Sequence, residues 1–247
     1  MIRHFSLARF PRIEFGPGAV GKVPQLAARY GSRALLVTGA QSFQASPHWE
    51  PLQSELGKAG LDWLHTTIDT EPSPQMVDSA VEGYAGERID VVIAIGGGSV
   101  LDAAKAIAGL LRIGDPVMDY LEGVGPEKPY RGPAVPFIAV PTTAGTGSEA
   151  TRNAVLSVIG EDGFKKSFRD EQLVPAWAVV DPDLLASCPR EQIAANGMDA
   201  LTQLIESYVS LNASRFTDSM AIDGCLLYTS DAADDAMMVW GAGGGGG

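Results

Sequence analysis

Asp90-Val91-Val92-Ile93-Ala94-Ile95-Gly96-Gly97-Gly98-Ser99 is the stretch of sequence that decides the fold. Residues 90–95 form a run dominated by β-branched valine and isoleucine, which is typical of a strand buried on both faces of a parallel sheet. Residues 99–111 place apolar side chains on one stripe, so they predict a helix. The stretch therefore predicts a buried strand, a glycine turn and a helix in direct succession.

The segments around this stretch alternate in the same way. Further buried strands are predicted at 33–38, 61–68, 137–140 and 176–180, and further helices at 50–59 and 74–86. Such alternation implies an α/β fold, in which helices cover both faces of a parallel sheet. From Pro189 the pattern becomes helical, with Asn196-Gly197 as a candidate break between two helices. We therefore place a domain boundary near residue 185.

The composition argues against several classes of partner. The chain has 247 residues, of which 45% are hydrophobic, and a formal net charge of −12. It lacks the clustered Lys and Arg that nucleic acids and anionic membranes require. Its two cysteines form no CxxC motif, and we find no signal peptide and no run of about 18 apolar residues. We expect a cytoplasmic protein that binds neither nucleic acid nor membrane.

The turn Gly96–Ser99 is a candidate pyrophosphate-binding loop. A strand, turn and helix in succession gather free backbone N–H groups at the positive end of the helix dipole. Glycine lets a diphosphate approach closely, and Ser99 is suited both to cap the helix and to donate to a phosphate oxygen. Asp102 and Lys105 follow one turn into the helix. The motif is neither G-x-G-x-x-G nor a P-loop, so a tight turn that binds nothing stays open.

A second polar loop follows the predicted strand at 137–140. Pro141–Glu149 interleaves threonine and serine hydroxyls with glycines, and such groups suit ribose and phosphate oxygens. A polar loop that only caps the next segment is the alternative. Further on, Lys165 and Lys166 supply cations for a ribose or phosphate, or else form a solvated pair on a surface hairpin.

These two loops, together with Asn196-Gly197-Met198-Asp199-Ala200-Leu201-Thr202-Gln203, closely resemble the iron-containing (group III) alcohol dehydrogenases. The resemblance runs from about residue 5 to about Gly224. It implies a dehydroquinate-synthase-like architecture, with a Rossmann-type parallel sheet followed by an all-helical domain that carries a divalent metal. It also implies hydride transfer between an alcohol and NAD or NADP, and family members commonly form homodimers.

The resemblance also implies roles for single residues. Gly97, Gly98 and Ser99 would hold the pyrophosphate, and Asp102 and Val155 would lie near the nicotinamide. The remaining expected cofactor contacts come from Ser73 near the adenosine, Lys165 at the nicotinamide ribose, and Thr142, Thr143 and Thr146 at phosphate and ribose.

Gly39 departs from the family pattern, which often has an aspartate for the adenosine ribose hydroxyls at this position. Without that carboxylate, a 2′-phosphate meets no like charge. We therefore expect that NADP is accepted or preferred, and we count Gly39 among the cofactor-binding positions.

The expected metal site departs further from the pattern. Asp199 and Gln203 have the i, i+4 spacing of the first two family ligands, but Gln203 replaces a histidine. An amide oxygen is a weaker ligand than imidazole for Fe²⁺ or Zn²⁺. The chain's histidines, His4, His48 and His65, all lie in the predicted nucleotide domain. We therefore expect the chain as written to hold no catalytic metal, and we nominate no catalytic residue.

The leading hypothesis is an NAD(P)-dependent alcohol dehydrogenase for a primary or secondary alcohol, C-terminally truncated and inactive as a fragment. The alternatives are a metal-independent reductase like maleylacetate reductase, and a nucleotide-binding module without catalysis. Dehydroquinate synthase is disfavoured, because its basic substrate-binding residues are not seen. We expect a dinucleotide-binding domain at 1–185, the start of a helical metal and substrate domain at 186–227, and a disordered, non-native tail at 228–247. Truncation would expose an apolar helical face.

Overall fold

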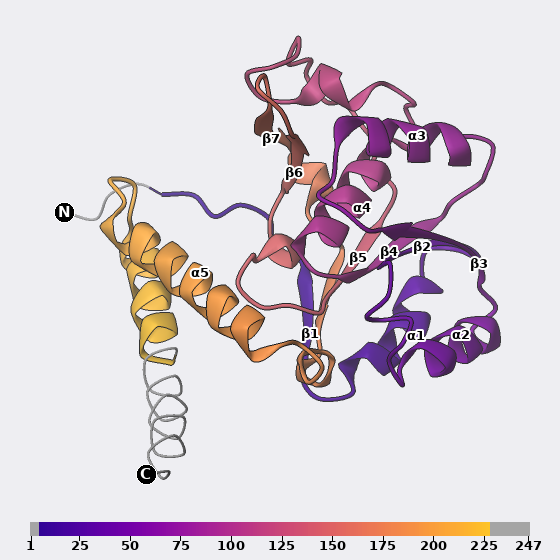
Figure 1. The fold of residues 1–247 in the computed structure, drawn as a ribbon, viewed down its shortest axis with the longest axis horizontal. Helices are drawn as coiled ribbons and strands as arrows, with labels where there is room; N and C mark the ends of the chain where they lie inside the picture. Colours follow the sequence, from indigo (N-terminus) through magenta and orange to yellow (C-terminus); the bar gives the residue numbers. More distant parts are fainter. Residues whose placement is uncertain (1–4, 228–247) are drawn as a thin grey trace, which may run out of the picture. The chain divides into compact units, whose positions relative to one another are not determined.

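The computed structural model describes residues 5–227, and the expected tail at 228–247 lies outside them. Contacts within the chain divide the described residues into two units, which are treated separately below (Figure 1). The larger unit comprises residues 8–143 and 147–188. The smaller unit comprises residues 5–7, 144–146 and 189–227.

The larger unit is built on a six-stranded sheet in the order β1-β8-β5-β4-β2-β3. Its strands are β1 (Arg12–Phe15), β2 (Arg33–Gly39), β3 (Asp62–Ile68), β4 (Val91–Gly96), β5 (Phe137–Pro141) and β8 (Trp177–Val180). Every neighbouring pair in this sheet is parallel. The predicted α/β class is therefore confirmed. A separate antiparallel hairpin consists of β6 (Asn153–Val158) and β7 (Phe164–Arg169).

The strand order reverses between β2 and β4. The chain runs outward from β2 to β3 and then returns to β4 on the opposite side of β2, with Thr38 paired to Ile95. The next strands, β5 and β8, continue away from that point. In open parallel sheets, ligands bind in the crevice at such a reversal, outside the carboxyl ends of the strands.

Two hydrophobic cores lie on opposite faces of the sheet, because successive side chains of a strand alternate. Leu35 and Val37 of β2 join one core, and Ala34 and Leu36 join the other. The first core includes residues of α3 (Pro74–Tyr84) and α4 (Gly98–Leu110). The second includes residues of α1 (Val23–Ala27) and α2 (Trp49–Lys58), which lie across the sheet from α3 and α4 (Figure 1).

Helix α4 packs unusually closely against its surroundings at two glycines. A Cβ at Gly96 would lie 2.6 Å from the Cβ of Val100, and one at Gly109 would lie 2.7 Å from Cδ2 of Leu173. The helix is capped by the extended backbone of Gly97, so the predicted capping role of Ser99 is wrong. Since β4 runs through Gly96, only Gly97 separates strand from helix, and Ser99 lies inside the first turn.

In the smaller unit, helix α5 (Arg190–Val209) is continuous, so the candidate break at Asn196-Gly197 is wrong. A glycine costs only about 1 kcal/mol inside a helix. Asn196 is buried, and its Oδ1 accepts a hydrogen bond of 2.8 Å from Nε2 of Gln192, one turn earlier. Residues 215–227 are helical again. Large apolar side chains on this unit are exposed, among them Met198 and Tyr208.

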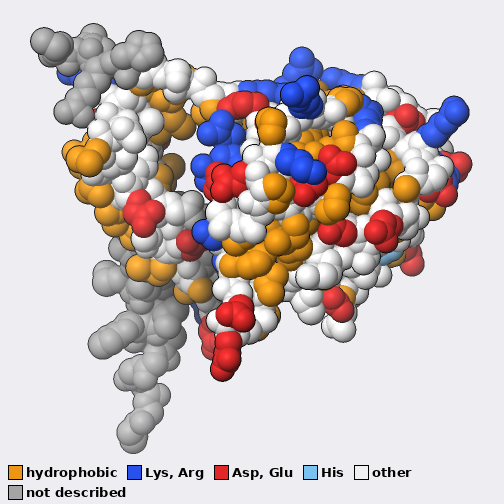
Figure 2. Space-filling model, turned by 90° about the horizontal axis from the view of Figure 1, so that it is seen from above, with side chains coloured by type: hydrophobic (Ala, Val, Ile, Leu, Met, Phe, Trp, Pro, Cys, Tyr) orange, Lys and Arg blue, Asp and Glu red, His pale blue; other side chains and the backbone are white. Residues whose placement is uncertain are grey.

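Charges of both signs are mixed on the surface. On the face seen in Figure 2, acidic side chains lie among the lysines and arginines, so no continuous basic surface forms there. Among the described residues, no helix has the length and apolar content that a membrane crossing requires.

The close approach at Gly96 predicts a specific loss of stability. Gly96→Ala should lower the free energy of unfolding by about 1–3 kcal/mol, because the added Cβ overlaps the side chain of Val100. Gly57→Ala in α2, where an added Cβ meets nothing within 4 Å, is the matched control and should be neutral or slightly stabilising. Urea unfolding followed by circular dichroism measures both, and equal midpoints for the two variants would contradict the packing described.

Candidate functional site

The carboxyl ends of β2, β4 and β5 bring three predicted segments to one edge of the sheet. A Cβ at Gly39 would lie 3.9 Å from Cγ2 of Val100, so the end of β2 adjoins the first turn of α4. The backbone N–H of Thr142 donates to the carbonyl of Gly96 over 3.0 Å. A Cβ at Gly97 would lie 3.2 Å from Oγ1 of Thr143. The glycine turn and the start of the threonine loop are thus in contact.

The N-terminus of α4 opens at this edge. The helix has 13 residues, and no side chain caps its first N–H groups. Uncapped amides and the helix dipole favour an anion at this position. The bare backbone of Gly97 leaves room beside Thr143 that a Cβ would fill. These residues therefore fit a pyrophosphate.

Glu71 joins two of the predicted cofactor residues and was not found from the sequence. Its carboxylate accepts a hydrogen bond from Oγ of Ser99 over 3.1 Å and lies 3.7 Å from Nζ of Lys165. Its only sequence signal is its place directly after β3, at the same edge of the sheet. Glu71 therefore engages the hydroxyl of Ser99 and faces the ammonium of Lys165, two groups that the sequence assigned to the cofactor.

Ser73 has a structural role next to this edge. It is the N-cap of α3, and its Oγ accepts a hydrogen bond of 3.2 Å from the backbone N–H of Met76. The preceding Pro72 accepts a hydrogen bond of 2.8 Å from the N–H of Ser157 in β6. The start of α3 is thereby tied to the hairpin, beside the glycine turn.

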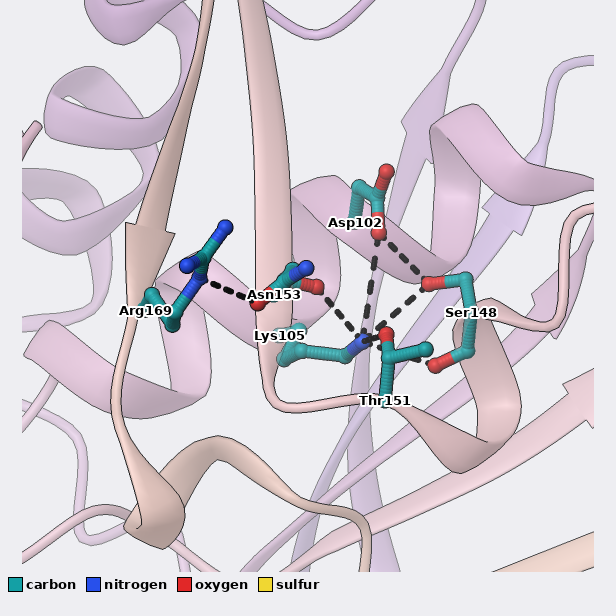
Figure 3. Close-up of polar contacts among 6 residues, drawn as sticks. All are labelled: Asp102, Lys105, Ser148, Thr151, Asn153 and Arg169. Atoms are coloured by element: carbon teal, nitrogen blue, oxygen red, sulfur yellow. Dashed lines mark hydrogen bonds and ion pairs between the residues drawn. The ribbon is translucent and has the colours of Figure 1, made fainter. Parts of the chain in front are cut away.

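Lys105 is completely buried and is therefore not a surface cation. Figure 3 shows the polar groups that surround its ammonium. Its Nζ donates over 2.7 Å to the carbonyls of Ser148 and Asn153, and over 3.2 Å to the hydroxyls of Ser148 and Thr151. Its Nζ also lies 3.9 Å from Oδ1 of Asp102. We call these five residues the Lys105 network. It joins α4 to η3 (Ser148–Ala150) and β6, the segments that follow the threonine loop.

Asp102 is the carboxylate of the network. Its Oδ1 accepts a hydrogen bond of 2.5 Å from Oγ of Ser148. Burial raises the pKa of Asp102, while Lys105, Ser148 and the backbone of Val155 oppose that rise. Burial also lowers the pKa of Lys105 to about 8, although Asp102 and Glu149 act in the other direction. The two charges stabilise one another in a setting that disfavours either alone.

The hairpin contributes the remaining predicted residues of the larger unit. Val155 in β6 interacts with Asp102 through its backbone, and the charge of Lys165 in β7 acts on the same carboxylate. Lys165 pairs with Ser157 in the ladder of the hairpin. The structure therefore brings together the following predicted residues at or beside one edge of the larger unit: Gly39, Ser73, Gly97, Gly98, Ser99, Asp102, Thr142, Thr143, Val155 and Lys165.

The other three predicted residues, Thr146, Asp199 and Gln203, belong to the smaller unit. Asp199 and Gln203 lie one turn apart on α5 and are exposed. The Nε2 of Gln203 donates to the carbonyl of Gly145 over 3.0 Å. Within residues 5–227, no three or more His, Cys, Asp and Glu side chains gather into a group that could hold a metal ion. One carboxylate and one amide oxygen do not fit a transition metal by themselves.

Comparison with known proteins identifies the fold and its relatives. The sequence model of the family described as "Iron-containing alcohol dehydrogenase" matches residues 11–182. The chain belongs to the iron-containing alcohol dehydrogenase family. The resemblance drawn from the glycine turn, the threonine loop and the segment around Asp199 is thus confirmed, as is the predicted fold.

Individual relatives agree with this assignment. The NAD-dependent methanol dehydrogenase of Bacillus methanolicus is 34% identical over 218 residues, which cover 88% of this chain and 56% of the relative. Alcohol dehydrogenase 4 of Saccharomyces cerevisiae (strain YJM789) is 40% identical over 212 residues, covering 85% and 54%. The sulfoacetaldehyde reductase of Bifidobacterium kashiwanohense, solved in complex with NAD⁺, superimposes with a TM-score of 0.83 at 30% identity, covering 92% and 59%. The chain thus spans about half the length of the relatives it matches.

The two candidate ligands on α5, Asp199 and Gln203, predict weak metal binding by this chain. After anaerobic incubation with Fe²⁺, or incubation with Zn²⁺, and desalting, elemental analysis should find well below one ion per chain. Asp199→Asn should leave that value unchanged, because Asp199 belongs to no group of three or more His, Cys, Asp and Glu side chains that could hold a metal among residues 5–227. One retained ion per chain that is lost in Asp199→Asn would contradict this assignment.

Proposed function

We propose that this chain binds NAD or NADP and forms the cofactor-binding part of a dehydrogenase that interconverts a primary or secondary alcohol and its aldehyde or ketone. The observation that carries the proposal is the uncapped N-terminus of α4, which follows the glycine turn directly at the reversal of strand order. Family membership and the names of relatives, which include an NAD-dependent methanol dehydrogenase, support it.

The residues of the chain bind and orient the cofactor. We assign Gly97, Gly98 and Ser99 to the pyrophosphate, and Asp102 and Val155 to the nicotinamide end. The other assignments are Ser73 to the adenosine, Lys165 to the nicotinamide ribose, and Thr142, Thr143 and Thr146 to phosphate and ribose. When bound, the nicotinamide ring accepts or supplies the hydride. We assign no general base among the described residues.

The metal belongs to the whole enzyme in this proposal, as Fe²⁺ or Zn²⁺, with Asp199 as one ligand and Gln203 at the position of another. Gln203 favours a second candidate, a metal-independent reductase like maleylacetate reductase, because it replaces an imidazole by a weaker amide ligand. Cofactor binding without turnover of any alcohol would instead make this chain a nucleotide-binding module.

We further propose a cytoplasmic location and a homodimer, as is common in the family.

Gly39 supports binding of NADP as well as NAD. It ends β2 at the carboxyl edge of the sheet, and an added Cβ would make only ordinary contacts at 3.9 Å with Ser42 and Val100. Its backbone tolerates a side chain, since its φ angle is not in the left-handed region. Glycine is therefore not needed here for the fold, and its lack of a carboxylate removes repulsion from a 2′-phosphate.

Titration with NADH and NADPH, followed by nucleotide fluorescence, tests the proposal. The wild-type chain should bind both, and Gly39→Asp should weaken NADPH at least about tenfold, or ~1.4 kcal/mol, with little change for NADH, because two anions would meet. Gly57→Asp adds the same charge on α2 where nothing lies within 4 Å, so it should change neither affinity.

Two results would count against these assignments in different ways. If the wild-type chain binds neither nucleotide, the proposed function is wrong. If it binds NADH far more tightly than NADPH, and Gly39→Asp makes no difference, only the inference about NADP is wrong.

A further inference from the structure

The tip of the threonine loop, which spans residues 141–149, lies against helix α5. Residues 144–146 of the loop belong to the same compact unit as the helix. Gly145 has a φ angle of +102°, and a Cβ there would lie 2.5 Å from the backbone carbonyl oxygen of Asn196. Any other residue would therefore be strained and would also lack space. Glycine at this position lets the loop backbone approach the helix directly.

A side chain of α5 makes a second contact with the same glycine. The Nε2 of Gln203 donates a hydrogen bond of 3.0 Å to the carbonyl of Gly145. Asn196 and Gln203 lie on one face of the helix, because residues at positions i and i+7 are two turns apart. The helix thus meets the loop tip at two points, with its backbone at Asn196 and with a side-chain amide at Gln203.

The contact made by Gln203 differs from the one that a metal would require. Gln203 stands where the family pattern has a metal-binding histidine. In the part of the chain that the structure describes, no three or more His, Cys, Asp and Glu side chains gather into a possible metal site. The bond to Gly145 uses the N–H of the amide, whereas a metal would use a lone pair. In this chain the position therefore serves the loop.

We propose that Gln203 is a positioning residue for the cofactor, which holds the tip of the threonine loop instead of binding a metal. The inference rests on the proposed function, in which Thr146 contacts phosphate or ribose. The carbonyl of Gly145 belongs to the peptide group that leads into Thr146. Holding this carbonyl restricts rotation of that peptide group, so less conformational entropy is lost when the nucleotide binds.

NMR relaxation and NADH titration of the wild type and Gln203→Met test the proposal. The substitution removes the donor and keeps the length of the side chain without adding a charge. In the free chain, the backbone order parameters of Gly145 and Thr146 should fall from about 0.85, the value of rigid backbone, toward about 0.6. The dissociation constant for NADH should rise about threefold to tenfold, because one hydrogen bond of a neutral amide is lost.

Two further variants separate the loss of the donor from other effects. Gln203→His keeps an N–H donor, and it should restore both the order parameters and the NADH affinity. It is measured with EDTA, so that no metal is bound, and at about pH 8, where the imidazole is neutral. Gln25→Met makes the methionine substitution at an exposed glutamine of α1 and should alter neither quantity.

The outcomes separate this inference from the proposed function. Unchanged order parameters in Gln203→Met would overturn the inference, as would a more mobile loop with wild-type NADH affinity. A loss that Gln203→His does not restore would also overturn it. If the wild type binds no NADH, the proposed function is wrong and the cofactor role of Gln203 fails with it. The order parameters of the free chain then still decide whether Gln203 holds the loop.

Discussion

The close contact between the end of β4 and the first turn of α4 is the constraint on which the rest of the site depends. A Cβ at Gly96 would come within 2.6 Å of the side chain of Val100, so only glycine lets the helix begin this near to the strand. That short connection leaves the helix N-terminus without a side-chain cap and places its amides at the carboxyl edge of the sheet, beside the reversal of strand order. The same geometry places Gly39 and Thr143 beside the turn. The close packing of β4 against α4 therefore produces a site suited to an anion.

The burial of Lys105 next to this site destabilises the folded protein at neutral pH. Its pKa is lowered from 10.5 to about 8 by burial, so the unfolded chain holds the proton more tightly than the folded protein. The free energy of unfolding therefore rises with pH between about 8 and 10.5, and the buried charge destabilises the fold at neutral pH. An arrangement that costs stability but orients two loops is typical of a functional site.

The sequence predicted the parts of the fold whose signals are local. Strands β2, β4 and β5 are buried on both faces, so each reads as a continuous apolar run. Strand β1 was missed because it lies at the edge of the sheet and its side chains are mostly exposed, so it lacks the apolar run of a buried strand. The sequence Phe-Lys-Lys-Ser-Phe-Arg of β7 is too charged to indicate a buried strand, and a surface hairpin was one of two alternatives for Lys165 and Lys166. Its pairing with β6 depends on the surrounding structure and not on a local pattern in its own sequence.

In the site too, only the parts with a local sequence signal could be predicted. The glycine turn and the threonine loop were recognisable because glycine and hydroxyl residues follow buried strands. Glu71 was not, since its contacts with Ser99 and Lys165 join three segments distant in sequence. Lys105 and Asp102 left one unused signal, two charges in a helix that is otherwise apolar on nearly every side.

Amide hydrogen exchange with and without NADH tests the central claim, that the N-terminus of α4 binds the pyrophosphate, most directly. The account predicts that the amides of residues 97–101 exchange more slowly once NADH is bound, together with those of Thr142 and Thr143, while α2 is unchanged. NADH binding that leaves residues 97–101 exchanging as fast as before would contradict it.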